Sequence, residues 1–272
     1  MLRIVIAQQF IKRMGSGKTR PCLIGCAELV ANVEDESEEA SPGEVELVVK
    51  FSDGCEAKKQ GLVAEALAAL LAADLDLPVP QPFLVQVEPD FVESIPDQEI
   101  KALAKSSVGL AFGSEKLPPQ YSTIMTGISL PQALIPMAAE IIAFDAMIVN
   151  PDRRVKNPNC LSNSRSLAIY DHELAFQTEG ILFWKPPWED VTFAPGDQRH
   201  VFLDMVKGGK IDFSRLQGAL EAITPERIDD YRASLPEEWG REDAATERIV
   251  AYIKQLREHS AAVIHQITTA LS

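Results

Sequence analysis

The stretch best equipped for chemistry is Asn-Pro-Asp-Arg-Arg-Val-Lys-Asn at residues 150–157, which contains Asp152 and ends at Asn157. A five-residue step from an aspartate to an asparagine is typical of a phosphotransferase loop, in which the aspartate orients the attacking hydroxyl and the asparagine holds a metal ion. Asp171 follows a short strand expected at residues 166–170, where this chemistry needs a further metal ligand. The three residues therefore predict phosphoryl transfer, with Asp152 as the catalytic residue and Asn157 and Asp171 as metal ligands.

An ordinary polar loop capped by an aspartate and an asparagine would show the same spacing, and the spacing taken alone favours that simpler explanation. The surroundings of the loop favour the catalytic interpretation. Residues 131–149 form the most apolar helical segment of the chain and should be buried, so they can hold the loop in place. The strand at residues 166–170 and the aspartate after it complete the arrangement.

Lys50 tests this interpretation. Phosphoryl transfer from a nucleotide needs a lysine on a strand to hold the phosphates and a carboxylate on the following helix to orient that lysine. Lys50 lies near the end of a strand expected at residues 44–51, and Glu65 is the isolated charge on a helix expected at residues 61–75. A lone charge on such an apolar helix needs a partner. We predict a Lys50–Glu65 pair, the alternative being two solvated surface groups.

The segment Gly15-Ser16-Gly17-Lys-Thr looks like part of a phosphate-binding P-loop. The P-loop motif, however, requires a glycine at the position of Lys12, and it opens a helix, whereas strands are expected on both sides of this segment. We expect instead a loop between two strands, in which the backbone N–H groups of Gly15, Ser16 and Gly17 cover nucleotide phosphates. A plain hairpin turn is the alternative.

The composition narrows the class of protein. The chain has 272 residues, and its 26 basic and 40 acidic residues give a net charge of −14. This acidic balance disfavours direct nucleic-acid binding, which needs a basic surface. No apolar run reaches the roughly 18 residues of a membrane span. Four scattered cysteines without a secretion signal are typical of a reduced, cytoplasmic protein, and their spacing does not predict a metal site.

The elements that must position the candidate residues change in character along the chain. Residues 1–87 are expected to form mainly strands with one helix, and residues 88–272 mainly helices, including a long one at residues 243–270. Strands followed by helices are typical of the α+β class. We therefore expect two unequal lobes, residues 1–87 and residues 88–272, that meet at a seam near residue 88.

Taken together, these segments resemble the HipA-like kinases of the protein-kinase and phosphoinositide-kinase superfamily, in particular the short members that lack a separate N-terminal subdomain. The resemblance covers residues 15–176 and rests on the loop at residues 150–157, Tyr170-Asp-His-Glu173, Val49-Lys-Phe51 and the helix that carries Glu65. It implies a two-lobed protein-kinase-like fold, dependence on ATP and Mg²⁺, and a serine or threonine of a protein as the usual acceptor. It also implies Asp152 as catalytic aspartate, Asn157 and Asp171 as metal ligands, and Lys50 as phosphate anchor.

Some segments depart from the pattern of conventional protein kinases. Asp171 is followed by His-Glu rather than Phe-Gly, and residues 177–197 match no known activation-loop motif. The aromatic residues of this loop are most simply explained as core residues under a lid. The glycine-spaced segment at residues 109–114 either lines the cleft or forms a turn, and His172 either shapes the metal site or is a structural histidine.

The basic residues beside Asp152 have two explanations. Arg153, Arg154 and Lys156 would offset negative charge in the transition state or bind an acidic substrate. A solvated basic face is the simpler account.

The residues do not select the acceptor. A kinase acting on a small molecule or a lipid head group would use the same core. A nucleotide-binding pseudokinase that regulates a partner is a second alternative, which the intact set of Lys50, Asp152, Asn157 and Asp171 disfavours. A third is a toxin-like kinase controlled by an antitoxin, as in some HipA-like systems. The expected partners are therefore ATP, an unidentified protein or small-molecule acceptor, and an antitoxin-like regulator.

Overall fold

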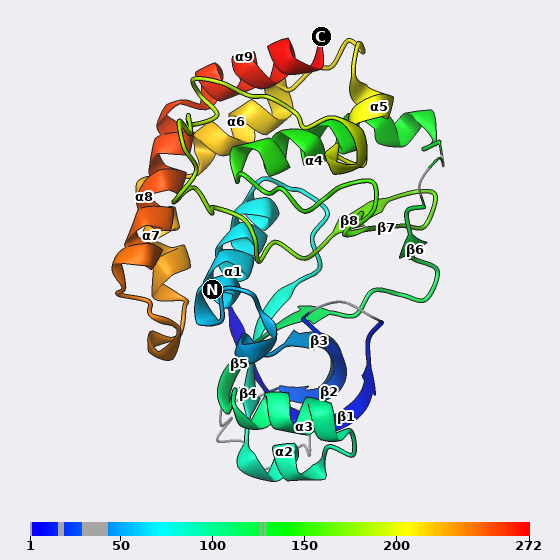
Figure 1. Ribbon diagram of the computed structural model, residues 1–272, viewed down its shortest axis with the longest axis vertical. Coiled ribbons are helices and arrows are strands. Elements are labelled where there is room, and N and C mark those ends of the chain that lie inside the picture. The colour runs from blue at the N-terminus through cyan, green and yellow to red at the C-terminus, as the bar shows by residue number, and fades with distance from the viewer. Residues whose placement is uncertain (1, 16–18, 29–42, 126, 128) are drawn as a thin grey trace, which may run out of the picture.

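The computed structural model describes residues 2–15, 19–28, 43–125, 127 and 129–272. Within these residues, one part of the chain forms a closed five-stranded barrel and the remainder is mainly helical (Figure 1). The barrel strands are β1 (Arg3–Arg13), β2 (Cys22–Glu28), β3 (Glu44–Lys50), β4 (Pro82–Val87) and β5 (Gly109–Glu115). The structure is therefore mixed, with a strand-rich part and a helical part, as the order of the predicted elements indicates.

The barrel has the strand order β1-β2-β3-β5-β4 and closes because β1 also pairs with β4, in parallel. Alternate residues of β3, including Leu47 and Val49, are fully buried inside it. Gly113 in β5 is required by close packing, because a Cβ atom there would lie 2.7 Å from the side chain of Val85. The glycine-spaced segment at residues 109–114 is thus a strand rather than a turn, and the barrel continues beyond residue 87.

The helical part and a small sheet complete the fold. The helices are α1 (Lys59–Asp74), α2 (Pro89–Ser94), α3 (Gln98–Lys105), α4 (Ile135–Met147), α5 (Leu203–Val206), α6 (Ser214–Ala222), α7 (Pro225–Ala233), α8 (Ala244–Glu258) and α9 (Ser260–Leu271). The antiparallel sheet contains β6 (Ser122–Thr123), β7 (Cys160–Ser162) and β8 (Leu167–Ile169). The single helix predicted at residues 243–270 is wrong in one respect: the backbone leaves helical geometry at His259 (φ −103°, ψ 20°) and separates α8 from α9.

Two apolar cores form among the described residues. One lies within the barrel and under α2 and α3, and the other is built around α1 and α4 and extends through the C-terminal helices. Helix α1 packs against β5, α7 and α8 (Figure 1), and all its residues from Gly61 to Ala72 are buried, as its run of alanine and leucine predicts. None of the helices that the structure describes is long and apolar enough to cross a membrane.

Candidate active site

The side chain of Lys50 joins three distant parts of the chain. Lys50 ends β3, Glu65 lies in α1, and Asp171 follows β8. The Nζ atom of Lys50 lies 2.8 Å from Oε2 of Glu65 and 2.6 Å from Oδ1 of Asp171. Lys50 and Glu65 are both buried, so neither is the solvated surface group of the alternative explanation.

The charges of this cluster stabilise one another. Burial acts to lower the pKa of Lys50, but Asp171 and Glu65 outweigh it and raise that pKa well above its ordinary value. Burial acts to raise the pKa of Glu65, but Lys50 and then His172 lower it below the usual range. The backbone N–H of His172 also donates to Oε2 of Glu65 over 2.7 Å. Lys50 and Glu65 therefore remain an ion pair at neutral pH.

Asp152 lies in the loop between α4 and β7, and both of its carboxylate oxygens accept hydrogen bonds. The side-chain amides of Asn157 and Asn159 donate to Oδ2 over 2.6 and 3.0 Å, and Arg154 donates to Oδ1 over 2.9 Å. The sequence prediction did not single out Asn159, although the Asn-Pro-Asn repeat at residues 157–159 is visible. These three donors fix the orientation of the Asp152 carboxylate.

The small sheet brings the loop of Asp152 beside Asp171. Cys160 of β7 pairs with Ile169 of β8, and the N–H of Tyr170 donates to the carbonyl oxygen of Asn159 over 3.2 Å. The segment before β7 and the segment after β8 therefore leave the sheet at the same end. Asp171 has a φ of +64°, a left-handed conformation that costs energy in an L residue, and its contact with Lys50 helps to hold it there.

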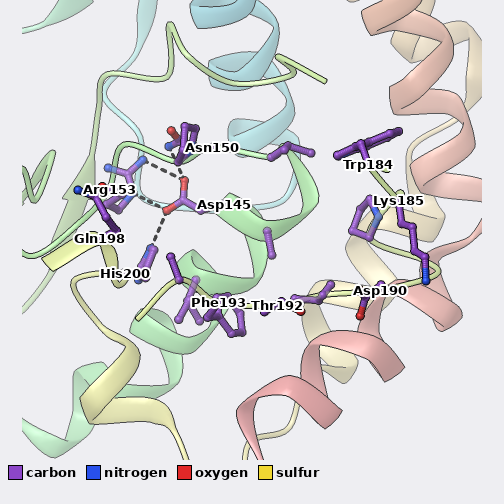
Figure 2. Close-up of a pocket in the computed structure, with 17 residues that line it drawn as sticks. Asp145, Asn150, Arg153, Trp184, Lys185, Asp190, Thr192, Phe193, Gln198 and His200 are labelled. Carbon is purple, nitrogen blue, oxygen red and sulfur yellow. Dashed lines mark hydrogen bonds and ion pairs between the residues drawn. The ribbon is translucent and has the colours of Figure 1, made fainter. Parts of the chain in front are cut away.

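Arg153 is fully buried and fixes this loop from behind. Its Nε atom donates to Asp145 over 2.6 Å (Figure 2), and its NH1 group donates to the carbonyl oxygens of Asn159 and Tyr170. Its NH2 group lies 2.9 Å from Nε2 of His172. The prediction of a solvated basic face is wrong for Arg153, because α4 supplies a buried counter-ion at Asp145.

The other two basic residues of the loop are in different surroundings. Arg154 is partly exposed and pairs with Asp152, whereas Lys156 is exposed and pairs with the exposed Asp197. Among the three, Lys156 therefore fits the description of a solvated basic residue, and Arg154 is the one that contacts the candidate catalytic carboxylate.

Asp145 holds two further side chains in place. The amide of Asn150 donates to its Oδ1 over 2.7 Å, and Nε2 of His200 lies 2.9 Å from its Oδ2 (Figure 2). The N–H of Phe202 donates to Nδ1 of His200, so the ring hydrogen is on Nε2 and is donated to Asp145. The sequence prediction assigned no role to Asp145 or His200. The available signal was an isolated aspartate within the most apolar helix.

Burial and neighbouring charges together set the protonation states of Asp145 and His200. Burial acts to raise the pKa of Asp145, but Arg153 and His200 outweigh it and lower that pKa below the usual range. Burial lowers the pKa of His200 below its ordinary value, although Asp145 acts in the opposite direction. Asp145 is thus ionised and His200 neutral at pH 7.

The donors at Asn157 and Asp171 fit a magnesium ion. Asn157 uses its amide nitrogen on Asp152, which leaves its amide oxygen as the atom available to a metal. Asp171 offers a carboxylate, and Mg²⁺ prefers oxygen ligands of this kind, usually one or two from the protein together with water and substrate phosphates. In the part of the chain that the structure describes, no group of three or more His, Cys, Asp or Glu side chains that could hold a metal is found.

Gly15 lies in the connection between β1 and β2, where the strands predicted on both sides place it. The N–H of Met14 donates to the carbonyl oxygen of Pro21 across the base of this loop over 2.8 Å. Gly15 has a φ of +41° and is exposed. Ser16 and Gly17, the other two predicted phosphate-covering residues, lie outside the described residues.

The segment at residues 177–197 covers the loop of Asp152 on one side. A cavity of about 390 Å³ lies between this segment, α4 and the loop, and its lining includes Asn150, Trp184, Lys185 and Phe193 (Figure 2). Trp188 stacks on His259 with ring centroids 5.0 Å apart. The explanation of the aromatic residues as core under a lid fits the two half-buried tryptophans but not Phe183, which is 88% exposed.

Comparison with known proteins shows the fold and the family of the chain. The crystal structure of the proinflammatory kinase CtkA of Helicobacter pylori superimposes with a TM-score of 0.53 and 12% sequence identity, over 100% of each chain. At this identity the likeness concerns the fold alone. No curated protein matches the chain. A model of the HipA-like kinase family matches residues 44–265, well over half of the chain. The chain therefore belongs to the HipA-like kinase family.

Proposed function

We propose that this chain is an ATP- and Mg²⁺-dependent kinase that transfers the γ-phosphoryl group of ATP to a hydroxyl group, with a serine or threonine of a protein as the acceptor. One observation carries the proposal: Lys50 contacts both Glu65 and Asp171. Phosphoryl transfer from ATP needs a lysine for the phosphates, a carboxylate that orients it and an aspartate for the metal. Here the buried ammonium group of Lys50 contacts both carboxylates, so the residues for all three roles lie together.

In this proposal the protein has two lobes, and ATP binds at the seam between them. The barrel with α2 and α3 forms one lobe, and the second apolar core, with α1 and α4 at its centre, forms the other. Because β5 pairs with β3 and β4, we place the boundary after Glu115 rather than at residue 87.

Each candidate residue then has a defined task. Lys50, oriented by Glu65, binds the phosphates, and the loop at Gly15 covers them with backbone N–H groups. Asp152, held by three donors, orients the acceptor hydroxyl and accepts its proton. The oxygens of Asn157 and Asp171 would hold Mg²⁺, which supplies the positive charge that offsets the triphosphate.

The acceptor class rests on membership of the family rather than on a contact in the site. The experiment is therefore a transfer assay with ATP labelled at the γ-position, in which the purified chain is offered denatured protein, serine- and threonine-containing peptides, or a small-molecule extract. We expect the label on protein hydroxyl groups, dependent on Mg²⁺ and strongly reduced with Asp152→Ala. If the label is confined to the small-molecule fraction, the acceptor is a small molecule rather than a protein. If no acceptor is labelled, the proposal is wrong.

A further inference from the structure

A second cavity, of about 340 Å³, lies where three segments meet: the start of α1, the residues after Asp171, and α8. Its described lining residues do not include Lys50, Asp152 or Asn157. The cavity is therefore lined by other residues than those assigned to the phosphates and the acceptor, although Glu173 in its lining interacts with Lys50. Its size is that of a small-molecule site.

Glu173 is the unusual residue of this lining. Its side chain is buried, and within the part of the chain that the structure describes its Oε2 atom has no hydrogen-bond partner. The thiol of Cys55 interacts with the carboxyl group of Glu173 and lies 3.7 Å from the carbonyl oxygen of Phe51, but it leaves Oε2 of Glu173 without a donor. Lys50 is bound to two other carboxylates. A buried carboxylate oxygen without a donor is costly. A ligand that brings a donor to Oε2 would remove this cost.

The second acidic residue of the lining does not share this feature. Glu179 pairs with Arg248 over 2.9 Å, and both side chains are largely exposed. The charge of Glu179 is therefore already offset at the rim, whereas Lys50, the cation that acts on Glu173, is bound directly to two other carboxylates. The cavity accordingly favours a ligand with one positive group.

The remaining lining suits a hydrocarbon body. Phe176 and Tyr252 form an edge-to-face pair with ring centroids 6.0 Å apart, and Ile249 and several alanines complete the wall. The hydroxyl of Tyr252 already donates to the carbonyl oxygen of Met147 over 2.6 Å, which leaves its ring as the contact surface. Aromatic rings attract cations as well as apolar groups.

We propose that this cavity binds a small organic amine, with its ammonium group at Glu173 and its apolar body against Phe176, Ile249 and Tyr252. Ala64 also lines the cavity and is the residue next to Glu65. The ligand would therefore contact α1 beside the carboxylate that pairs with Lys50, which is a position suited to regulation. The proposal does not depend on the catalytic roles assigned above.

The test is calorimetric titration of the full chain, without ATP or Mg²⁺, using 2-phenylethylamine and its neutral analogue 2-phenylethanol. We expect saturable binding of the amine and binding of the alcohol that is weaker by about tenfold or more, because a charge-assisted hydrogen bond is lost. Glu173→Gln should weaken binding of the amine by a similar factor. Glu179→Gln, at the exposed rim, is the matched control and should change it by less than about threefold.

A second variant keeps the test independent of Glu173. Ala245 lines the cavity from α8 and is half-buried, so Ala245→Phe should fill the cavity without removing the carboxylate and should also abolish binding of the amine. The proposal is wrong if the parent does not bind the amine, if amine and alcohol bind equally, or if either variant binds the amine like the parent. Because no nucleotide is present, this result is independent of the kinase assay.

Discussion

The guanidinium group of Arg153 lies 2.9 Å from Nε2 of His172, and both side chains are buried. A guanidinium group only donates hydrogen bonds, so Nε2 accepts and the ring hydrogen is on Nδ1, 3.7 Å from Oε1 of Glu65. This contact packs the residue after Asp152 against the residue after Asp171. The segments that carry the two candidate aspartates are therefore joined by a buried contact between their neighbouring residues.

We expect Arg153→Met to destabilise the protein strongly. The substitution keeps most of the buried volume but leaves the buried Asp145 carboxylate without its main counter-ion. Breaking one side of a buried ion pair costs about 3–5 kcal/mol, and urea denaturation would measure it. Lys156→Met is the control, because its ion pair with Asp197 is exposed and should matter little. Equal effects of the two substitutions would show that the buried pair is not important for stability.

Stability should fall as the pH decreases from 7, and His200 should be responsible for part of the fall. The pKa of His200 in the folded protein lies below the unfolded value of about 6.5. Just below pH 6.5 the unfolded chain therefore binds a proton that the folded protein does not, which favours unfolding. Glu65 and Asp145, whose pKa values are lowered, add their loss only below about pH 4.5.

His200→Gln tests the histidine contribution, because a glutamine amide can donate to Asp145 but does not titrate. The free energy of unfolding should decrease less between pH 7 and pH 5.5 in the variant than in the parent. An identical slope in both proteins would assign the pH dependence to other groups.

The parts of the site that could be predicted from sequence are those whose signal is local. Asp152 and Asn157 lie in one loop, so their spacing can be recognised in the sequence without knowledge of the rest of the fold. The Lys50–Glu65 contact spans 15 positions, and it could be predicted because an isolated charge on an apolar helix needs a partner.

The remaining parts depend on contacts that leave no local pattern. His200 reaches Asp145 across 55 positions, and no spacing rule connects a loop histidine with an aspartate on a distant helix. Similarly, the pairing of β5 with β3 depends on closure of the barrel, so a segment with two glycines resembled a turn. Arg153 resembled a surface residue because it lies in a run of polar and charged residues, whereas its buried partner Asp145 comes from a helix.

Lys50 and Glu65 should act as one unit in catalysis. Either Lys50→Ala or Glu65→Ala should reduce phosphoryl transfer, and the double substitution should cost much less than the product of the two effects. The reason is that removal of either partner disorganises the other. Lys58→Ala, an exposed lysine just before α1, is the control. Independent, multiplicative effects in a double-mutant cycle would show that the two residues work separately.

Asp152→Ala should separate nucleotide binding from transfer. Asp152 is bound by side chains of its own loop and does not contact Lys50 or Glu65 in any hydrogen bond found among the described residues. We expect nearly unchanged affinity for an ATP analogue and transfer reduced by roughly two to four orders of magnitude, the effect of losing one positioned acid–base group. The exposed Asp90 in α2 provides the control substitution. Transfer at the parent rate would remove Asp152 from the catalytic role.

In the proposed function, the charge balance of the chain makes nucleotide binding depend on Mg²⁺. A chain of net charge −14 has no general attraction for a triphosphate. The fixed cation Lys50 is already shared between Glu65 and Asp171, so it cannot offset three phosphates. A divalent metal ion would supply the missing charge, and Asp171 is the carboxylate that we propose as its ligand.

Asp171→Asn should therefore abolish the enhancement of ATP binding by Mg²⁺ while leaving weak, metal-free binding nearly unchanged. The substitution keeps the shape of the side chain and removes the charge that makes it a good magnesium ligand. Calorimetric titration of an ATP analogue into parent and variant, each with Mg²⁺ and with chelator, measures both quantities. The chelator arm reports any damage caused by loss of the contact with Lys50 alone. An equal Mg²⁺ enhancement in the two proteins would exclude Asp171 from the metal site, and with it the strongest reason for reading residues 152–157 as a catalytic loop.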